Sequence, residues 1–134
     1  MKRAGVIGDP IAHSKSPIIH GYWLETLGID GRYDRFAIEP ERLADGVAAL
    51  VASGVCGFNV TIPHKQKIMD LCSEVSDTAQ QIGAVNTVTV LPDGRLSGDN
   101  TDAFGFRSNL VASVDPTALA RAGSALVLGA GGAA

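Results

Sequence analysis

The hydrophobic positions along this chain follow two periods in turn. Four short apolar runs have strand-like patterns and are bounded by turn residues: 2–8, 33–38, 55–62 and 84–91. Between and after them, apolar residues recur at helical spacing within 16–27, 43–53, 63–72, 77–82 and 102–114. Strands that alternate with helices predict an α/β fold, here with a mixed, mostly parallel sheet flanked by helices.

Turn and cap residues refine these elements. Ser16-Pro17 suits the N-cap and the first residue of a helix, and Gly28 suits its end. Residues 92–94 (Pro-Asp-Gly) predict a turn, after which residues 95–97 return as a hairpin partner of the preceding strand.

The end of the sequence predicts a second domain. A last apolar run at 125–128 passes directly into glycines, as a buried parallel strand does at the start of a Rossmann-type fold. We therefore expect one domain over residues 1–101. Residues 102–134 would then be a connecting helix followed by the first strand and glycine-rich turn of a truncated dinucleotide-binding domain.

Composition and charge narrow the function. The net charge is −3 and no basic run is present, which argues against nucleic-acid binding. No apolar stretch reaches the roughly 18–20 residues that span a bilayer, and the amino terminus becomes polar too early for a signal peptide. The two cysteines, Cys56 and Cys72, are best read as reduced thiols. We expect a cytoplasmic protein that binds a small molecule, without a metal site.

Polar residues at the ends of predicted strands are the candidate site. Ser14 and Ser16 follow the first strand; they could bind a polyol or carboxylate, or Ser16 could simply cap the helix. Asn59 and Thr61 point to one face of their strand, and Lys65 follows where Pro63 ends it. Ligands of open α/β sheets bind at such carboxyl ends, although a solvated lysine beside an edge strand would look the same.

Two further polar segments have functional and structural interpretations. Asn86 lies in an otherwise apolar strand, so its amide either braces the backbone or meets a ligand. Asp102 lies near the expected domain junction, where it could cap a helix or face Lys65. The terminal glycines suit a diphosphate at a helix N-terminus, although a flexible linker has a similar composition. They lie in residues 129–133 (Gly-Ala-Gly-Gly-Ala).

Five ordered motifs across the whole chain resemble those of the shikimate dehydrogenase family. They are Ser14-Lys15-Ser16-Pro17, Asn59-Val60-Thr61-Ile62-Pro63-His64-Lys65, Gly83-Ala84-Val85-Asn86-Thr87, Asn100-Thr101-Asp102 and Gly129-Ala130-Gly131-Gly132-Ala133. The resemblance implies a two-domain, NADP-dependent oxidoreductase that interconverts 3-dehydroshikimate and shikimate in aromatic amino-acid biosynthesis.

The same resemblance implies roles for individual residues. Lys65 and Asp102 would flank the reacting hydroxyl, with Lys65 as the proton donor in reduction. Substrate would be bound by these two together with Ser14, Ser16, Asn59, Thr61 and Asn86. The cofactor would be bound by Gly129, Ala130, Gly131, Gly132 and Ala133, with Asp77 near it.

Two alternatives remain open at this point. One is a quinate/shikimate dehydrogenase, although the two serines of the first motif favour shikimate. The other is a non-catalytic shikimate-binding module. Because most of the family's cofactor domain is missing from these 134 residues, we expect no useful hydride transfer from them alone. We also expect a tendency to associate, for example as a homodimer, through the apolar face that the second domain would cover.

Overall fold

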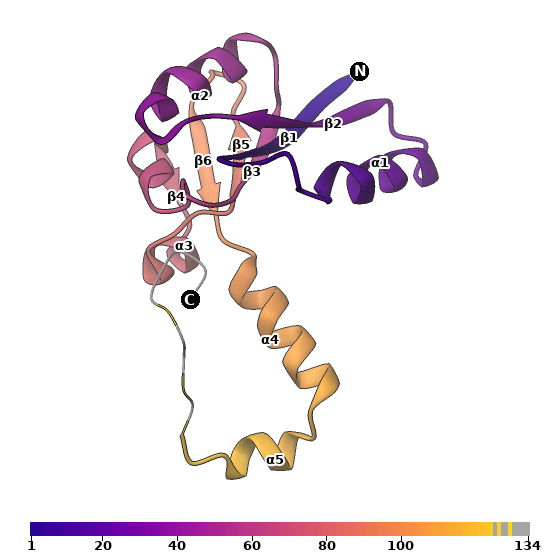
Figure 1. The fold of residues 1–134 in the computed structure, drawn as a ribbon, viewed down its shortest axis with the longest axis vertical. Coiled ribbons are helices and arrows are strands. Elements are labelled where there is room, and N and C mark those ends of the chain that lie inside the picture. Colours follow the sequence, from indigo (N-terminus) through magenta and orange to yellow (C-terminus); the bar gives the residue numbers. More distant parts are fainter. Residues whose placement is uncertain (125, 127–128, 130–134) are drawn as a thin grey trace.

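A computed structural model describes residues 1–124, 126 and 129 of the chain and shows one six-stranded sheet in the order β2-β1-β3-β5-β6-β4 (Figure 1). The strands are β1 (Lys2–Gly8), β2 (Gly31–Ala37), β3 (Gly57–Val60), β4 (Glu74–Val75), β5 (Thr87–Val90) and β6 (Leu96–Asp99). The pairs β1–β2, β1–β3 and β4–β6 are parallel, whereas β3–β5 and β5–β6 are antiparallel. The predicted mixed, mostly parallel sheet is therefore confirmed.

The strand directions bring several chain segments to one edge of the sheet. Strands β1, β3 and β6 run the same way, so their carboxyl ends lie at the same edge. Strand β5 runs the opposite way, so its amino end, preceded by Asn86, lies there too. We call this the site edge, because every polar segment predicted from the sequence up to Asp102 adjoins it, including Asp77, which follows the carboxyl end of β4.

The helices among the described residues are α1 (Ser16–Thr26), α2 (Leu43–Ala52), α3 (Asp77–Ile82), α4 (Asp102–Ser113) and α5 (Pro116–Arg121), with 3₁₀ turns at Pro40–Arg42 and Lys67–Leu71. Some of them cover the two faces of the sheet. Helices α1 and α2 lie on opposite sides of the β1–β2 pair in Figure 1, as right-handed crossovers in opposite directions require. The buried core comprises Ile7, Ile38, Leu43, Val47, Val55, Phe58, Val60, Ile68, Ala79, Val85, Val88 and Leu96.

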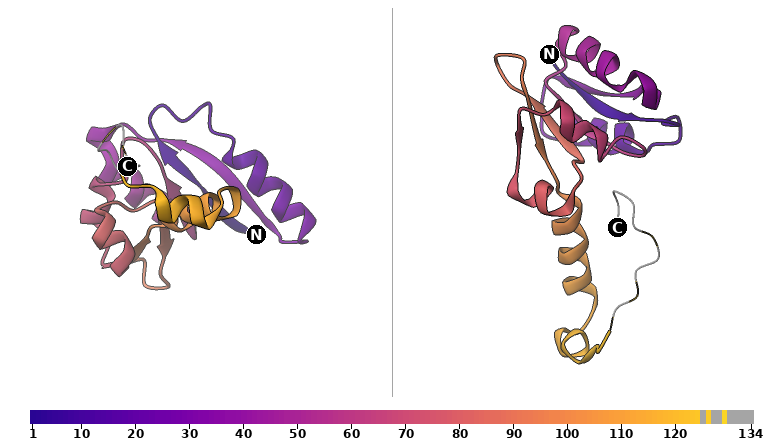
Figure 2. Two further views of the ribbon diagram at one scale, coloured as in Figure 1. Left: turned by 90° about the horizontal axis from the view of Figure 1, so that it is seen from below. Right: turned by 90° about the vertical axis from the view of Figure 1, so that its left-hand side faces the viewer.

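Helices α4 and α5 extend away from the sheet rather than covering it (Figure 2). Helix α4 has no buried residue, and Phe104 and Phe106 on it are largely exposed. The predicted break at Asp115-Pro116 is confirmed: α4 ends at Ser113, and the Asp115 carboxylate accepts from the backbone N–H of Thr117 at the start of α5.

One sequence expectation needs correction, one strand was not predicted, and one predicted strand lies mostly outside the described residues. The N-cap of α1 is Lys15 rather than Ser16, and Ser16 is instead the first helical residue. The two-residue strand β4, which pairs with β6, was not predicted, because two residues are too few to show alternation. The predicted strand at 125–128 lies outside the described residues except for Leu126.

Candidate functional site

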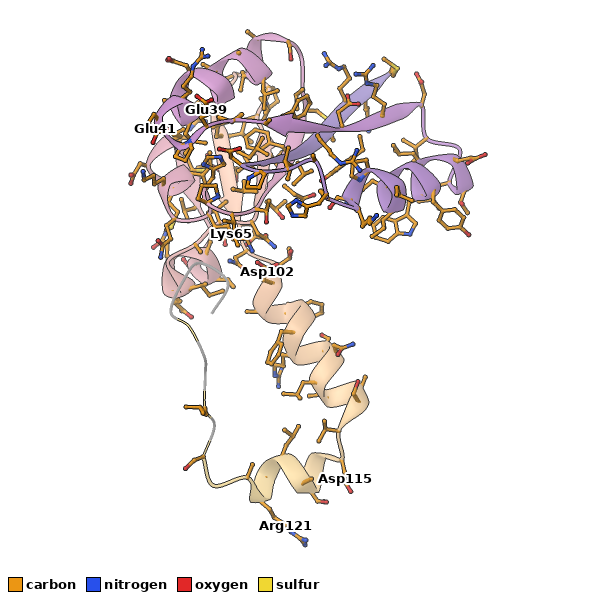
Figure 3. The ribbon with its side chains drawn as sticks, in the orientation of Figure 1. Glu39, Glu41, Lys65, Asp102, Asp115 and Arg121 are labelled. Atoms are coloured by element: carbon orange, nitrogen blue, oxygen red, sulfur yellow. The ribbon has the colours of Figure 1, made fainter. Side chains whose placement is uncertain are left out.

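The centre of the site edge is an ion pair between Lys65 and Asp102. The Lys65 Nζ lies 2.5 Å from Asp102 Oδ2, and the two side chains are labelled in Figure 3 where α4 leaves the sheet. The Lys65 side chain is 14% exposed and that of Asp102 is 48% exposed. The amine is thus mostly enclosed while its carboxylate partner reaches solvent. The predicted proximity of these two groups is what the structure shows.

Lys65 is held by a short segment that follows β3. The buried ring of His64 lies with Nε2 2.7 Å from the Ile38 carbonyl oxygen, and because that oxygen only accepts, Nε2 carries the proton. The Lys65 carbonyl accepts from the backbone N–H of Val85 at 2.7 Å. These bonds fix the backbone on either side of the Lys65 side chain, so its amine points to the site edge rather than into solvent.

Asp102 is held at the start of α4. Its Oδ1 accepts from Asn86 Nδ2 at 2.7 Å, and its backbone N–H donates to Asn100 Oδ1 at 2.9 Å. A carboxylate in the first turn of a helix is also stabilised by the exposed N–H groups and the positive end of the helix dipole. One oxygen of Asp102 therefore faces an amide and the other faces the amine of Lys65.

Asn86 braces the backbone, which was one of the two interpretations of this residue, and its predicted contact with a ligand stays a prediction. Its buried amide oxygen accepts from the Thr101 backbone N–H at 3.0 Å and from the Thr87 hydroxyl at 2.8 Å. Its NH₂ group donates to Thr101 Oγ1 at 2.9 Å as well as to Asp102. Asn86 thus braces the backbone that leads into α4 and orients the Asp102 carboxylate.

Asn59 and Thr61 extend the site edge along β3. Thr61 is half-buried and its backbone N–H donates to the Ile7 carbonyl at 3.0 Å, which ties it to β1. A Cβ at Gly8 would lie 2.7 Å from the Thr61 methyl, so only glycine fits beside it. Asn59 accepts from the Tyr33 hydroxyl at 2.7 Å. Tyr33 was not among the predicted site residues, because in the sequence it is one aromatic of an alternating strand.

The two serines lie in the loop between β1 and α1. The Ser14 hydroxyl oxygen accepts from the backbone N–H of Ser16, the first residue of α1, at 3.3 Å. The Arg35 guanidinium donates to the Ser14 carbonyl through Nε at 2.9 Å and Nη2 at 2.6 Å. This exposed cation was also missed by the sequence interpretation. It places a positive charge near hydroxyls that were predicted to hold a carboxylate.

Of the residues assigned to a cofactor, the structure describes Asp77 and Gly129, and neither is hydrogen-bonded to Lys65 or Asp102. Asp77 is the exposed first residue of α3, and in the described chain its side chain forms no hydrogen bond or ion pair. Of the glycine-rich segment, only Gly129 is described, with φ of +117°, and the others, 130–133, lie outside the described residues.

Other features of the described residues lie away from this pair. A hollow of about 450 Å³ between α2 and the start of β6 is lined mainly by small and apolar side chains and includes neither Lys65 nor Asp102. No cluster of three metal-binding side chains occurs within the described residues. None of the described helices combines the length and apolar character needed to span a bilayer.

Comparisons with known proteins agree with this geometry. The family model for the shikimate dehydrogenase substrate binding domain matches residues 6–88. The "Shikimate dehydrogenase (NADP(+))" of Rhodospirillum rubrum is 52% identical over 131 residues, which are 98% of this chain and 46% of that protein. The chain thus spans about half the length of the curated relatives it matches.

Two solved structures are similar in fold. Shikimate 5-dehydrogenase from Thermus thermophilus, in complex with shikimate, superposes with a TM-score of 0.87 and 44% identity over 99% of this chain and 49% of its own. The 5-ketofructose reductase of Gluconobacter sp. strain CHM43 superposes with a TM-score of 0.79 and 31% identity over 86% of this chain and 41% of its own. The family model covers more than half of the residues, so this chain belongs to the shikimate dehydrogenase family.

Proposed function

We propose that this chain is the substrate-binding part of an NADP-dependent enzyme that reduces 3-dehydroshikimate to shikimate in aromatic amino-acid biosynthesis. The observation that carries the proposal is the mostly enclosed Lys65 amine, 2.5 Å from the Asp102 carboxylate at the site edge. Reduction of a ketone requires a hydride at carbon and a proton at oxygen, and this pair is suited to deliver the proton.

The proton transfer is assigned to Lys65. In its ammonium form the amine donates a proton to the ketone oxygen as that oxygen gains negative charge, and the product is a hydroxyl group. Asp102 fixes the direction of the amine, because its Oδ2 faces Lys65 while its Oδ1 is held by Asn86. In the reverse direction the neutral amine accepts the hydroxyl proton.

The serine loop is assigned to the carboxylate of the substrate. Ser14 and Ser16 carry hydroxyls two residues apart, and the Arg35 guanidinium is bonded to the carbonyl of Ser14. Two donors beside a positive charge favour an anionic group over a neutral one. Asn59 and Thr61, which lie on and directly after β3, are between the serine loop after β1 and Asp102 after β6 in the sheet order. They are assigned to substrate hydroxyls.

NADPH, when bound, would supply the hydride that the ketone carbon requires. The residues of this chain proposed to hold its diphosphate are Gly129 and residues 130–133, with Asp77 nearby. Gly129 has a positive φ that side-chain-bearing residues rarely adopt, which suits a tight turn whose backbone approaches a phosphate.

The division of the chain into domains is also a proposal. Residues 1–101 would form the substrate domain, and residues 102–134 would begin the cofactor domain. A homodimer and a cytoplasmic location are part of the same proposal. Exposed apolar side chains on α1, such as Tyr22 and Trp23, support association between copies of this chain. Light scattering of the purified chain across a concentration series tests the dimer.

Calorimetric titration of this chain with three ligands tests the substrate. We expect shikimate to bind at least about tenfold more tightly than 5-ketofructose, which lacks a carboxylate, with quinate between them. Replacing both serines (Ser14→Ala with Ser16→Ala) should remove most of the preference, whereas Ser113→Ala, at the exposed end of α4, should not. Binding of 5-ketofructose alone would instead assign a sugar reductase, and tightest binding of quinate would assign the quinate alternative.

A further inference from the structure

A hydrogen-bonded chain of side chains begins beyond the residues assigned above, at Tyr33 on β2. The Tyr33 hydroxyl donates to Asn59 Oδ1 at 2.7 Å. Asn59 Nδ2 donates in turn to the Asn86 carbonyl at 3.3 Å and to Thr87 Oγ1 at 3.2 Å. The Thr87 hydroxyl donates to the Asn86 side chain, which holds Asp102. Tyr33 is therefore linked to the carboxylate beside Lys65 through three intervening side chains.

The direction of these bonds is fixed by chemistry. A backbone carbonyl only accepts, so the NH₂ group of Asn59 must face Asn86. The amide oxygen must then face Tyr33, and the Tyr33 hydroxyl must donate to it. Both hydrogens of the NH₂ group are used within the protein, whereas Oδ1 keeps one lone pair. In this arrangement Asn59 can only accept a hydrogen bond from a bound molecule.

Tyr33 itself is held in place for this contact. It pairs in register with Ala4 of β1, whereas Asn59 of β3 pairs with Val6 two residues further along β1. The tyrosine therefore reaches Asn59 diagonally across β1, past the small side chain of Ala4. The His20 ring of α1 stacks on the tyrosine ring, with centroids 4.0 Å apart and an interplanar angle of 2°. Burial raises the pKa of Tyr33 to about 12, so the phenol remains a donor at neutral pH.

We propose that Tyr33 is a positioning residue for substrate binding. Its hydroxyl, together with the Asn86 carbonyl, locks the Asn59 amide so that the oxygen presents an acceptor to a hydroxyl group of the substrate. This inference rests on the proposed function for the identity of the ligand, a polyhydroxylated acid. The orientation of Asn59, however, is a property of the protein before any ligand binds.

The first measurement therefore uses the ligand-free chain. In ¹⁵N NMR spectra, the two side-chain amide protons of Asn59 should give sharp, well-separated signals that are protected from exchange. Tyr33→Phe should broaden or shift these signals while the backbone spectrum keeps its native dispersion. Tyr22→Phe is the matched control, because Tyr22 is 65% exposed on α1. Unchanged Asn59 signals in the Tyr33→Phe chain would overturn the positioning role.

The second measurement is shikimate affinity by calorimetry. Loss of one hydrogen bond at a binding side chain predicts about fivefold weaker binding for Tyr33→Phe and no change for Tyr22→Phe. In an Asn59→Ala background, Tyr33→Phe should have no further effect, because its role is exercised through Asn59. An equal loss in both backgrounds would overturn the proposal, because Tyr33 would then act independently of Asn59.

The same variants separate binding from chemistry in an extended protein, in which this chain continues into the second half of the Rhodospirillum rubrum relative. Tyr33→Phe should raise KM for shikimate about fivefold and leave kcat within about twofold. A fall in kcat with unchanged KM would overturn the assignment to binding. If the unmodified chain does not bind shikimate at all, the proposed function fails, and the NMR comparison alone decides whether Tyr33 positions Asn59.

Discussion

The sheet with its packed helices and the projecting arm, formed by α4 and α5, use their side chains in contrasting ways. The sheet region has a continuous core in which residues such as Ile7 and Ile68 are fully buried. Helix α4 buries none of its residues, and Phe104 and Phe106 are 74% and 71% exposed. The arm joins the sheet through polar groups around Asp102. Stability thus depends on the sheet region, whereas the arm contributes one carboxylate to the site.

Replacing one phenylalanine in each region by alanine should give the largest difference between the sheet region and the arm, measured as the free energy of unfolding. Phe58→Ala in the core should lower the free energy of unfolding by about 3–5 kcal/mol, because it removes buried apolar surface and leaves a cavity. Phe106→Ala on the arm should change it by no more than about 0.5 kcal/mol. Urea unfolding of the two variants measures both values. Similar losses would mean that the arm is packed in solution.

The catalytic role proposed for Lys65, the partner of the ion pair that follows β3, is tested in the extended protein. Lys65→Ala should lower kcat for shikimate oxidation by about 100-fold, which is the usual scale of general acid–base catalysis. Lys67→Ala, an exposed lysine two residues later, is the matched control. A change of kcat within about threefold would leave Lys65 as a binding residue only.

The polar joint between the two regions is tested at Asn86. Asn86→Ala leaves the Thr101 N–H without its acceptor and Asp102 without its amide donor, at a cost of about 1–3 kcal/mol in unfolding free energy. Hydrogen exchange should also become faster in the first turn of α4 than in β3. Uniform acceleration across both would contradict a local joint and indicate global destabilisation instead.

The smallest expected effect is a pH dependence at Tyr33. Its pKa is raised from 10.0 to about 12 in the folded chain, so the unfolded chain loses the phenol proton first. The stabilisation is therefore complete below about pH 10 and is lost as the pH rises towards about 12. Thermal unfolding between about pH 9 and about pH 11 should show a shallower fall in Tm for Tyr33→Phe than for Tyr22→Phe. Parallel curves of Tm against pH for the two variants would contradict Tyr33 as the origin of the pH dependence.

The sequence predicted the strands and helices that have clear periods. Strands β1 and β2 and helix α2 lie close to the ranges that their apolar patterns predict. Strand β4 could not be predicted, since its two residues are ordered by pairing with β6. Such pairing is a tertiary effect that local periodicity does not record.

The candidate site was predictable where residue type and chain order were sufficient. Lys65 and Asp102 were expected to meet from the family motifs, and the structure places them in contact. The contributions of Tyr33 and Arg35 were not predicted, because each depends on which strands are neighbours. Tyr33 reaches Asn59 across β1, and no pattern within residues 31–37 reveals that β1 carries a small residue at the crossing.

Asp102 is at once the first residue of a twelve-residue helix and the partner of the Lys65 amine. A tilt of α4 about its first turn would swing the carboxylate while leaving the sheet undisturbed. The position of the Asp102 carboxylate relative to the Lys65 amine is consequently coupled to the angle between α4 and the sheet.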